Sequence, residues 1–102
     1  MLLALEDEEK KYFDTVTTGI AEHKQEIDKM ILSKLKNWTI ERIFKIDLAV
    51  LRLAAYEIVY FENMPPKVAV NEAVELAKKY GNDASSTFVN GVLREIIKDK
   101  GI

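Results

Sequence analysis

The chain has 102 residues, of which 48% are hydrophobic and 31% are charged, and its formal net charge is −2. This length indicates a single domain over residues 1–102, and the balance of apolar and charged residues excludes a disordered chain. The absence of cysteine excludes disulfides, thiolate metal sites and a cysteine nucleophile, and the slightly negative charge argues against a strongly basic nucleic-acid surface.

The N-terminus carries no targeting signal that we can identify. Met1–Leu5 is apolar, but Glu6 and Asp7 follow at once, whereas a secretory signal begins with basic residues and has a longer apolar core. No apolar stretch approaches the roughly 20 residues that a membrane-spanning helix needs. We therefore expect a cytoplasmic protein.

In the first half of the chain, apolar residues recur three or four positions apart, which is the spacing of one helix face. They predict a helix from Glu6 to His23, a further helical segment and, after a break near Asn37–Trp38, a short turn that Thr39 caps. Gly19 either weakens the first helix or lets another helix approach closely. The apolar residues behind this prediction are Tyr12, Phe13, Val16, Ile20, Ile27, Met30, Ile31, Leu35, Ile40, Ile43 and Phe44.

The segment Leu48–Phe61 is apolar on nearly all sides, which predicts a central and mostly buried helix with Asp47 as its N-cap. Arg52 lies within this apolar run. Because an unpaired buried charge is strongly destabilising, Arg52 either reaches the surface along its aliphatic stem or pairs with a carboxylate, for which Glu57 and Glu72 are the candidates.

Proline and glycine mark the boundaries of the last two helices. Pro65–Pro66 ends the central helix and begins the next one, which runs to a C-terminal signal at Gly81. A final helix is capped by Asp83 or Ser85 and closed by Gly101. The fold class is therefore all-α, a helical bundle of about five helices.

No constellation in the sequence indicates catalysis. His23 is the only histidine and lies among charged residues on what reads as a solvated helix face. Glu72 and Glu75 share a helix face, but a carboxylate metal site in a bundle needs matching Glu and His residues on other helices, and no Glu-x-x-His occurs. We expect no catalytic residue, no metal, no cofactor and no enzyme activity.

The strongest local feature is the run Ser85–Gly91. If Ser85 opens the last helix, Phe88 lies in its first turn, where free N–H groups attract phosphate and an aromatic ring can stack on an unpaired base, which is worth about 1–3 kcal/mol per base. The alternative is that Phe88 is a core residue one turn before Val92. The spacing by itself favours the core.

Three blocks of the sequence resemble the NusB family. Asp47–Glu57 (DLAVLRLAAYE) resembles the family's central helix, Pro66–Gly81 is similar to its next helix, and Phe88–Leu93 (FVNGVL) is similar to its terminal signature. The blocks occur in the order and spacing of the family, so the resemblance covers essentially the whole chain.

This resemblance implies a non-catalytic adaptor in transcription antitermination, notably in ribosomal RNA operons. NusB proteins bind the boxA element of nascent RNA together with the ribosomal protein NusE, within the RNA polymerase antitermination complex. The resemblance places Ser85, Phe88 and Asn90 in the RNA-binding region, and Glu41 and Asp47 on the acidic surface for the basic partner NusE. The two acidic residues can instead be capping or solvated residues.

The chain also departs from the family pattern. NusB proteins begin with an arginine-rich helix and a second helix, and nothing like them precedes Glu6. We therefore expect weakened RNA affinity and an exposed apolar surface that favours a homodimer. Ala84 stands near a position where the family often has an acidic residue that influences RNA affinity. Two alternatives remain open: the RNA-binding domain of a ribosomal RNA cytosine methyltransferase, and a structural or oligomerising helical domain.

Overall fold

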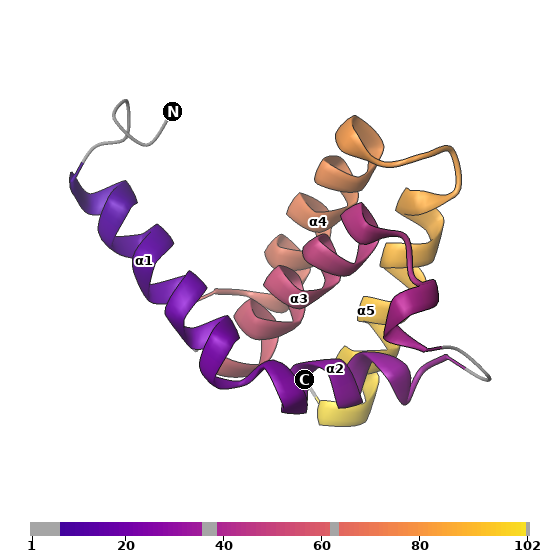
Figure 1. Cartoon of the computed structure of the whole chain (residues 1–102), viewed down its shortest axis with the longest axis horizontal. Coiled ribbons are helices and arrows are strands. Elements are labelled where there is room, and N and C mark those ends of the chain that lie inside the picture. Colours follow the sequence, from indigo (N-terminus) through magenta and orange to yellow (C-terminus); the bar gives the residue numbers. More distant parts are fainter. Residues whose placement is uncertain (1–6, 36–38, 62–63, 102) are drawn as a thin grey trace.

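The computed structural model describes residues 7–35, 39–61 and 64–101, so the break expected at Asn37–Trp38 lies outside the described residues. Within these ranges the chain forms five α-helices, one short 3-10 helix and no strand, which confirms the all-α class (Figure 1). The elements are α1 (Asp7–Glu22), α2 (Lys24–Leu32), η2 (Ile40–Arg42), α3 (Lys45–Tyr60), α4 (Pro66–Tyr80) and α5 (Ser85–Lys100).

Helices α3, α4 and α5 pack on one another and form the body of the molecule. Helix α2 crosses one end of this body and packs on α3 and α5, whereas α1 leads away from it and contacts α3 and α2 (Figure 1). As its apolar composition predicts, α3 is buried on most sides. The largest side chains that are almost fully buried are Ile27, Ile31, Leu51, Val89, Leu93 and Ile96. None of the described helices combines the length and apolar character needed to cross a bilayer.

Helix α1 meets the body of the protein through a glycine. Gly19 is buried, and a Cβ at this position would overlap the ring of Tyr56 on α3. The close helix approach expected as one of two roles for Gly19 is therefore confirmed. Beyond it, α1 ends at Glu22, and His23 separates α1 from α2 instead of continuing one exposed helix face.

The predicted C-terminal boundaries of α3, α4 and α5 agree with the structure. Phe61 ends α3 before the two prolines, and Pro66 opens α4. Gly81 follows α4 in an extended conformation, and its lack of a side chain is needed because a Cβ would lie 2.7 Å from the carbonyl oxygen of Ala77. Gly101 closes α5 in the left-handed conformation, with φ of 70°, which favours glycine.

The predicted N-caps were less accurate. Asp47 is not the cap of α3: the helix begins at Lys45 with Phe44 at the cap position, and Asp47 is its third residue. Thr39 does hold the cap position of η2, but its side chain makes no capping hydrogen bond. A carboxylate in a first turn is still favourable, because the N-terminal end of a helix carries partial positive charge.

Candidate nucleic-acid interface

The start of α5 is held by hydrogen bonds within the preceding loop, and no side chain caps the helix. Neither Asp83 nor Ser85 caps the helix, because Ala84 holds the cap position. The Asn82 side-chain carbonyl accepts a hydrogen bond from the Ala84 N–H at 2.9 Å, and the Asn82 N–H donates to the Ser85 hydroxyl at 2.9 Å. Ser85 is fully buried. Its hydroxyl therefore holds the α4–α5 loop in place.

Phe88 lies one turn into α5, and its packing agrees with the core position that the spacing favours. Its side chain is partly buried and packs against the hydrophobic core, and part of the ring stays accessible. An aromatic ring fixed at its base by the core can still offer its accessible part to a base. Phe88 therefore packs on the core with a side chain that remains partly accessible.

Asn90 does not share a surface with Phe88. Two positions along an α-helix rotate the side chain by about 200°, so these two residues point to opposite flanks of α5. On the Asn90 flank, the Asn90 carbonyl oxygen accepts a hydrogen bond from Arg94 Nε at 3.1 Å. The three predicted RNA-binding residues are therefore distributed over a buried position and two separate flanks.

A groove between α4 and α5 lies on this second flank. We call it the α4–α5 groove, and it has a volume of about 560 Å³. Two antiparallel neighbouring helices bring the start of α4 beside the end of α5 (Figure 1). The sequence alone does not predict this groove, although the spacing of Asn90, Arg94 and Lys98 indicates one helix face. The groove is lined by Pro66, Lys67, Val70, Asn71, Arg94, Ile97 and Lys98.

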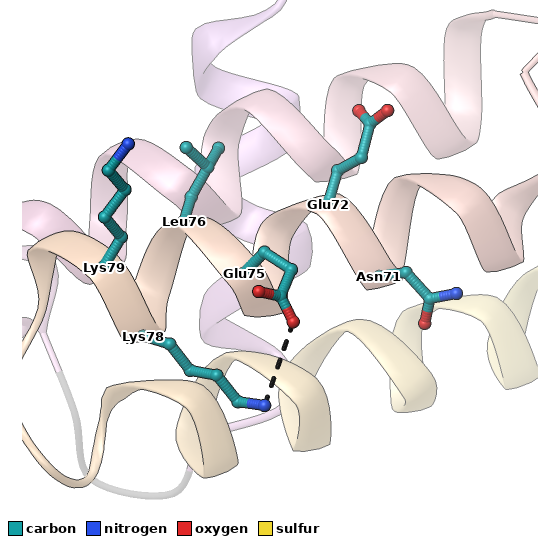
Figure 2. A pocket seen from close by; sticks show the side chains of 6 residues that line it. All are labelled: Asn71, Glu72, Glu75, Leu76, Lys78 and Lys79. Carbon is teal, nitrogen blue, oxygen red and sulfur yellow. Dashed lines mark ion pairs between the residues drawn. The ribbon is translucent and has the colours of Figure 1, made fainter.

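The outer surface of α4 offers a different, mixed-charge hollow. Figure 2 shows Glu72, Leu76 and Lys79 on one side of the helix and Glu75 and Lys78 on the other. Lys78 Nζ lies 3.8 Å from a Glu75 carboxylate oxygen, and both side chains are exposed. Exposed pairs of this kind contribute little to stability. Within the described part of the chain, no three His, Asp or Glu side chains gather as ligands for a metal ion.

The two predicted acidic contacts for a protein partner differ in exposure. Glu41 is exposed on η2 and lines a shallow hollow with the cations Lys45 and Arg52. Asp47 is only 5% exposed, and its Oδ1 atom has no hydrogen-bond partner among the described residues. An unpaired buried carboxylate oxygen is costly, so a donor that reaches Asp47 would gain a strong hydrogen bond.

Arg52 pairs with a carboxylate, but with neither predicted partner. Its Nε and Nη2 atoms donate to the two carboxylate oxygens of Asp28 on α2, at 2.8 and 2.9 Å. Both side chains are largely buried, with exposed fractions of 22% for Arg52 and 16% for Asp28. Glu57 and Glu72 were thus wrong as partners, because the fold brings a residue 24 positions away to Arg52. The pair ties α2 to the central helix.

His23 lies in an aromatic cluster rather than on a solvated face. Its ring stacks on Tyr60 with centroids 4.2 Å apart, and its Nδ1 lies 3.5 Å from Glu26. The Tyr60 hydroxyl donates to Glu26 at 2.7 Å, and this hydrogen bond lowers the pKa of the Glu26 carboxyl below its ordinary value. Burial, followed by the bond to Glu26, raises the pKa of Tyr60 to about 12. The cluster joins the α1–α2 junction to the end of α3.

Comparison with known proteins gives one consistent result. The family model described as "NusB family" matches residues 2–98. The chain is 50% identical over 93 residues to transcription antitermination protein NusB of Clostridium botulinum, and 48% identical over 95 residues to that of Bacillus subtilis. Each match covers 91% of this chain; this chain spans 65% of the clostridial relative's length and 72% of the other's.

Solved structures agree with the sequence comparison. T. maritima NusB superposes with a TM-score of 0.89 at 37% identity, covering 92% of this chain and 66% of that chain. A chain in the crystal structure of a plectonemic RNA supercoil superposes with a TM-score of 0.88 at 30% identity, covering 94% of this chain and 70% of that chain. The helical arrangement of this chain is therefore shared with both of these solved structures.

Proposed function

Because this chain belongs to the NusB family, we propose that it acts as a non-catalytic transcription antitermination adaptor that binds boxA RNA together with the ribosomal protein NusE. In this role it brings an RNA signal and a protein to RNA polymerase and performs no chemistry itself. The single observation that carries the proposal is the 48–50% identity to antitermination proteins over 91% of the chain. Both relatives are named transcription antitermination proteins, which favours the adaptor function over that of an RNA-binding domain in a methyltransferase.

On the RNA side, the proposal assigns different roles to the three residues near the start of α5. Phe88 offers the accessible part of its ring to an unpaired base. Ser85 acts as a positioning residue, because its buried hydroxyl holds the loop that leads into α5. Asn90 contacts RNA from the opposite flank, where it also orients Arg94.

The test on the RNA side is the affinity for boxA RNA, measured by fluorescence anisotropy. At about 100 mM salt we expect weak or no binding by this chain alone, so affinity is compared at lower salt, where electrostatic contacts are less screened. Phe88→Ala should weaken binding by about 1–3 kcal/mol, the worth of one stacked base. Tyr80→Ala is the comparison variant, because Tyr80 is an exposed aromatic at the C-terminal end of α4 that is not among the predicted RNA contacts.

Circular dichroism must show that the Phe88→Ala protein remains folded, since Phe88 also packs on the core. The assignment of Phe88 fails if a folded Phe88→Ala variant and the Tyr80→Ala control bind boxA RNA equally well. Tight binding by the unaltered chain at about 100 mM salt would contradict the expected weakness.

On the protein side, Glu41 is exposed on η2 and is the residue whose environment best supports a direct contact with NusE, whereas Asp47 is only 5% exposed. The Oδ1 atom of Asp47 is buried and has no hydrogen-bond partner among the described residues, so a basic side chain of NusE reaches it only if neighbouring side chains move aside. Asp47→Lys should reduce NusE binding in isothermal titration calorimetry, and Asp47→Asn, which preserves the shape, separates loss of charge from misfolding. Glu41→Gln tests the exposed neighbour, with Asp83→Asn in the α4–α5 loop as the control. Unchanged affinity for folded Asp47 variants would remove Asp47 from the interface.

A further inference from the structure

We propose that the α4–α5 groove is a second RNA-contact surface, which holds the phosphates of a single strand. The inference rests on the proposed function, because it takes RNA as the ligand, and it extends the contact of Asn90 along the same flank of α5 to cations that the proposed function does not assign to RNA. Its central residues are Lys67 on α4 and Arg94 and Lys98 on α5.

The α4–α5 groove is positively charged. Lys67, Arg94 and Lys98 line it from both walls, and no carboxylate lies among its lining residues. This local excess of positive charge occurs on a chain whose formal net charge is −2. Among the described residues, none of the three cations takes part in an ion pair. Three cations along one groove, without an ion pair to any described residue, favour an anionic ligand with repeated charges.

Arg94 is oriented by a hydrogen bond to a neighbouring side chain on α5. Its Nε atom donates to Asn90 one turn earlier, at 3.1 Å, which fixes the side chain along α5. Within the described residues the terminal guanidinium nitrogens make no other hydrogen bond, so they remain available to a ligand. A guanidinium held in this way can donate two parallel hydrogen bonds to one phosphate. Lys98 follows one turn later and adds a second charge on the same wall.

The extent of the apolar lining of the groove distinguishes between two anionic ligands, RNA and an acidic protein helix. The aliphatic lining residues are Pro66, Val70 and Ile97, which lie within about one helical turn near one end of the two helices. A docked amphipathic helix needs apolar anchors over two or more turns, which this lining does not supply. A polynucleotide needs only cations along its backbone, and the amide of Asn71 offers it a further hydrogen bond. The observations therefore favour RNA.

The groove predicts a kind of contact that differs from that of Phe88. It has no aromatic ring on which a base could stack, so its contribution comes from phosphates and is insensitive to base sequence. Around the axis of α5, Phe88 points about 120° away from Arg94, and the ten-residue step from Phe88 to Lys98 spans about 15 Å along the helix.

The test combines localisation with salt dependence on the intact chain. A single-stranded boxA RNA of about 12 nucleotides and a scrambled RNA of the same composition are titrated at low salt. In ¹⁵N-correlation spectra, the backbone amides of Lys67, Arg94 and Lys98 and the side-chain amide of Asn71 should shift with both RNAs. Such spectra detect weak binding, so an absence of shifts at these residues overturns the proposal.

The second measurement compares two triple variants with the same loss of charge. The groove variant Lys67→Gln/Arg94→Gln/Lys98→Gln should lose about tenfold or more in affinity for both RNAs, and its salt slope should fall by about 2, or roughly 0.7 per lost phosphate contact. The control variant Lys11→Gln/Lys24→Gln/Lys45→Gln removes three exposed cations outside the groove. Equal losses in the two variants overturn the groove, because they show only an effect of net charge.

The outcomes separate this inference from the proposed function. If the chain prefers boxA to the scrambled RNA but the groove variant behaves like the control, the groove is refuted and the proposed function stands. If the groove variant loses affinity and slope while the chain shows no preference for boxA, the groove stands and boxA recognition is refuted. If the groove variant keeps its RNA affinity but loses binding to an acidic helical peptide, the ligand class is wrong.

Discussion

The close approach of α1 and α3 at Gly19 provides the most direct test of the packing. A Cβ at this position would lie 2.6 Å from Tyr56 Cε1, and two further atoms of the same side chain would be nearer still. Carbon atoms normally pack at about 3.5–4.0 Å, so the ring must move by about 1 Å or α1 must move away from α3. In the Gly19→Ala variant the new methyl group would therefore overlap the ring of Tyr56.

Tyr56 has little freedom to move. It is 7% exposed, and its ring centroid lies 5.3 Å from those of both Tyr60 and Phe61. Overpacking of a constrained core site costs about 1–3 kcal/mol, and the overlap at Gly19 belongs at the upper end of this range. Replacement of a helical glycine by alanine returns about 1 kcal/mol. We therefore expect Gly19→Ala to lower the free energy of unfolding by about 1–2 kcal/mol.

Urea denaturation followed by circular dichroism measures this change, and thermal unfolding should show a decrease of about 4–8 °C for each kcal/mol. Gly91→Ala is the matched control, because Gly91 lies within α5 and a Cβ there would meet nothing within 4 Å. This control should gain up to about 1 kcal/mol. In a Tyr56→Leu background, Gly19→Ala should lose most of its cost, since the ring is gone. A stability gain for Gly19→Ala equal to that of Gly91→Ala would refute the packing described here.

Three further predictions concern stability and association. Arg52→Met should lower the free energy of unfolding by about 1–3 kcal/mol in urea denaturation, because it leaves the Asp28 carboxylate largely buried without its partner; an unchanged midpoint would contradict a structural role for the pair. The raised pKa of Tyr60, about 12, means that its contribution to stability is fully present below pH 10 and is lost as the pH rises towards 12. In thermal unfolding measured at several pH values, Tyr60→Phe should remove the decrease in stability between pH 10 and 12, whereas Tyr80→Phe should retain it. If both variants lose stability equally over this range, Tyr60 is not the group responsible. Light scattering should show concentration-dependent self-association through exposed apolar side chains, which include Phe44 at 47% exposure, and a monomer over the whole concentration range would disprove this.

The sequence by itself determined the helical class and most helix ends, because these depend on local chemistry. Apolar spacing reports which face of a helix is buried, and Pro66 and Gly101 act through their own backbone restrictions. The opposite directions of Phe88 and Asn90 were also available from the sequence, since they follow from 3.6 residues per turn. The family resemblance rested on the same local blocks and is confirmed over residues 2–98.

Only the tertiary structure decided which distant residues meet. Arg52 pairs with Asp28 from α2, and Tyr60 meets His23 and Glu26 across the α1–α2 junction. The burial of Asp47 and the groove formed by Lys67 and Lys98 likewise depend on how helices pack. Single-residue propensities carry no information on such pairings, because the same helix can satisfy its apolar face against many neighbours. The choice is made by the joint packing of all the helices, and it places the cations of the α4–α5 groove side by side.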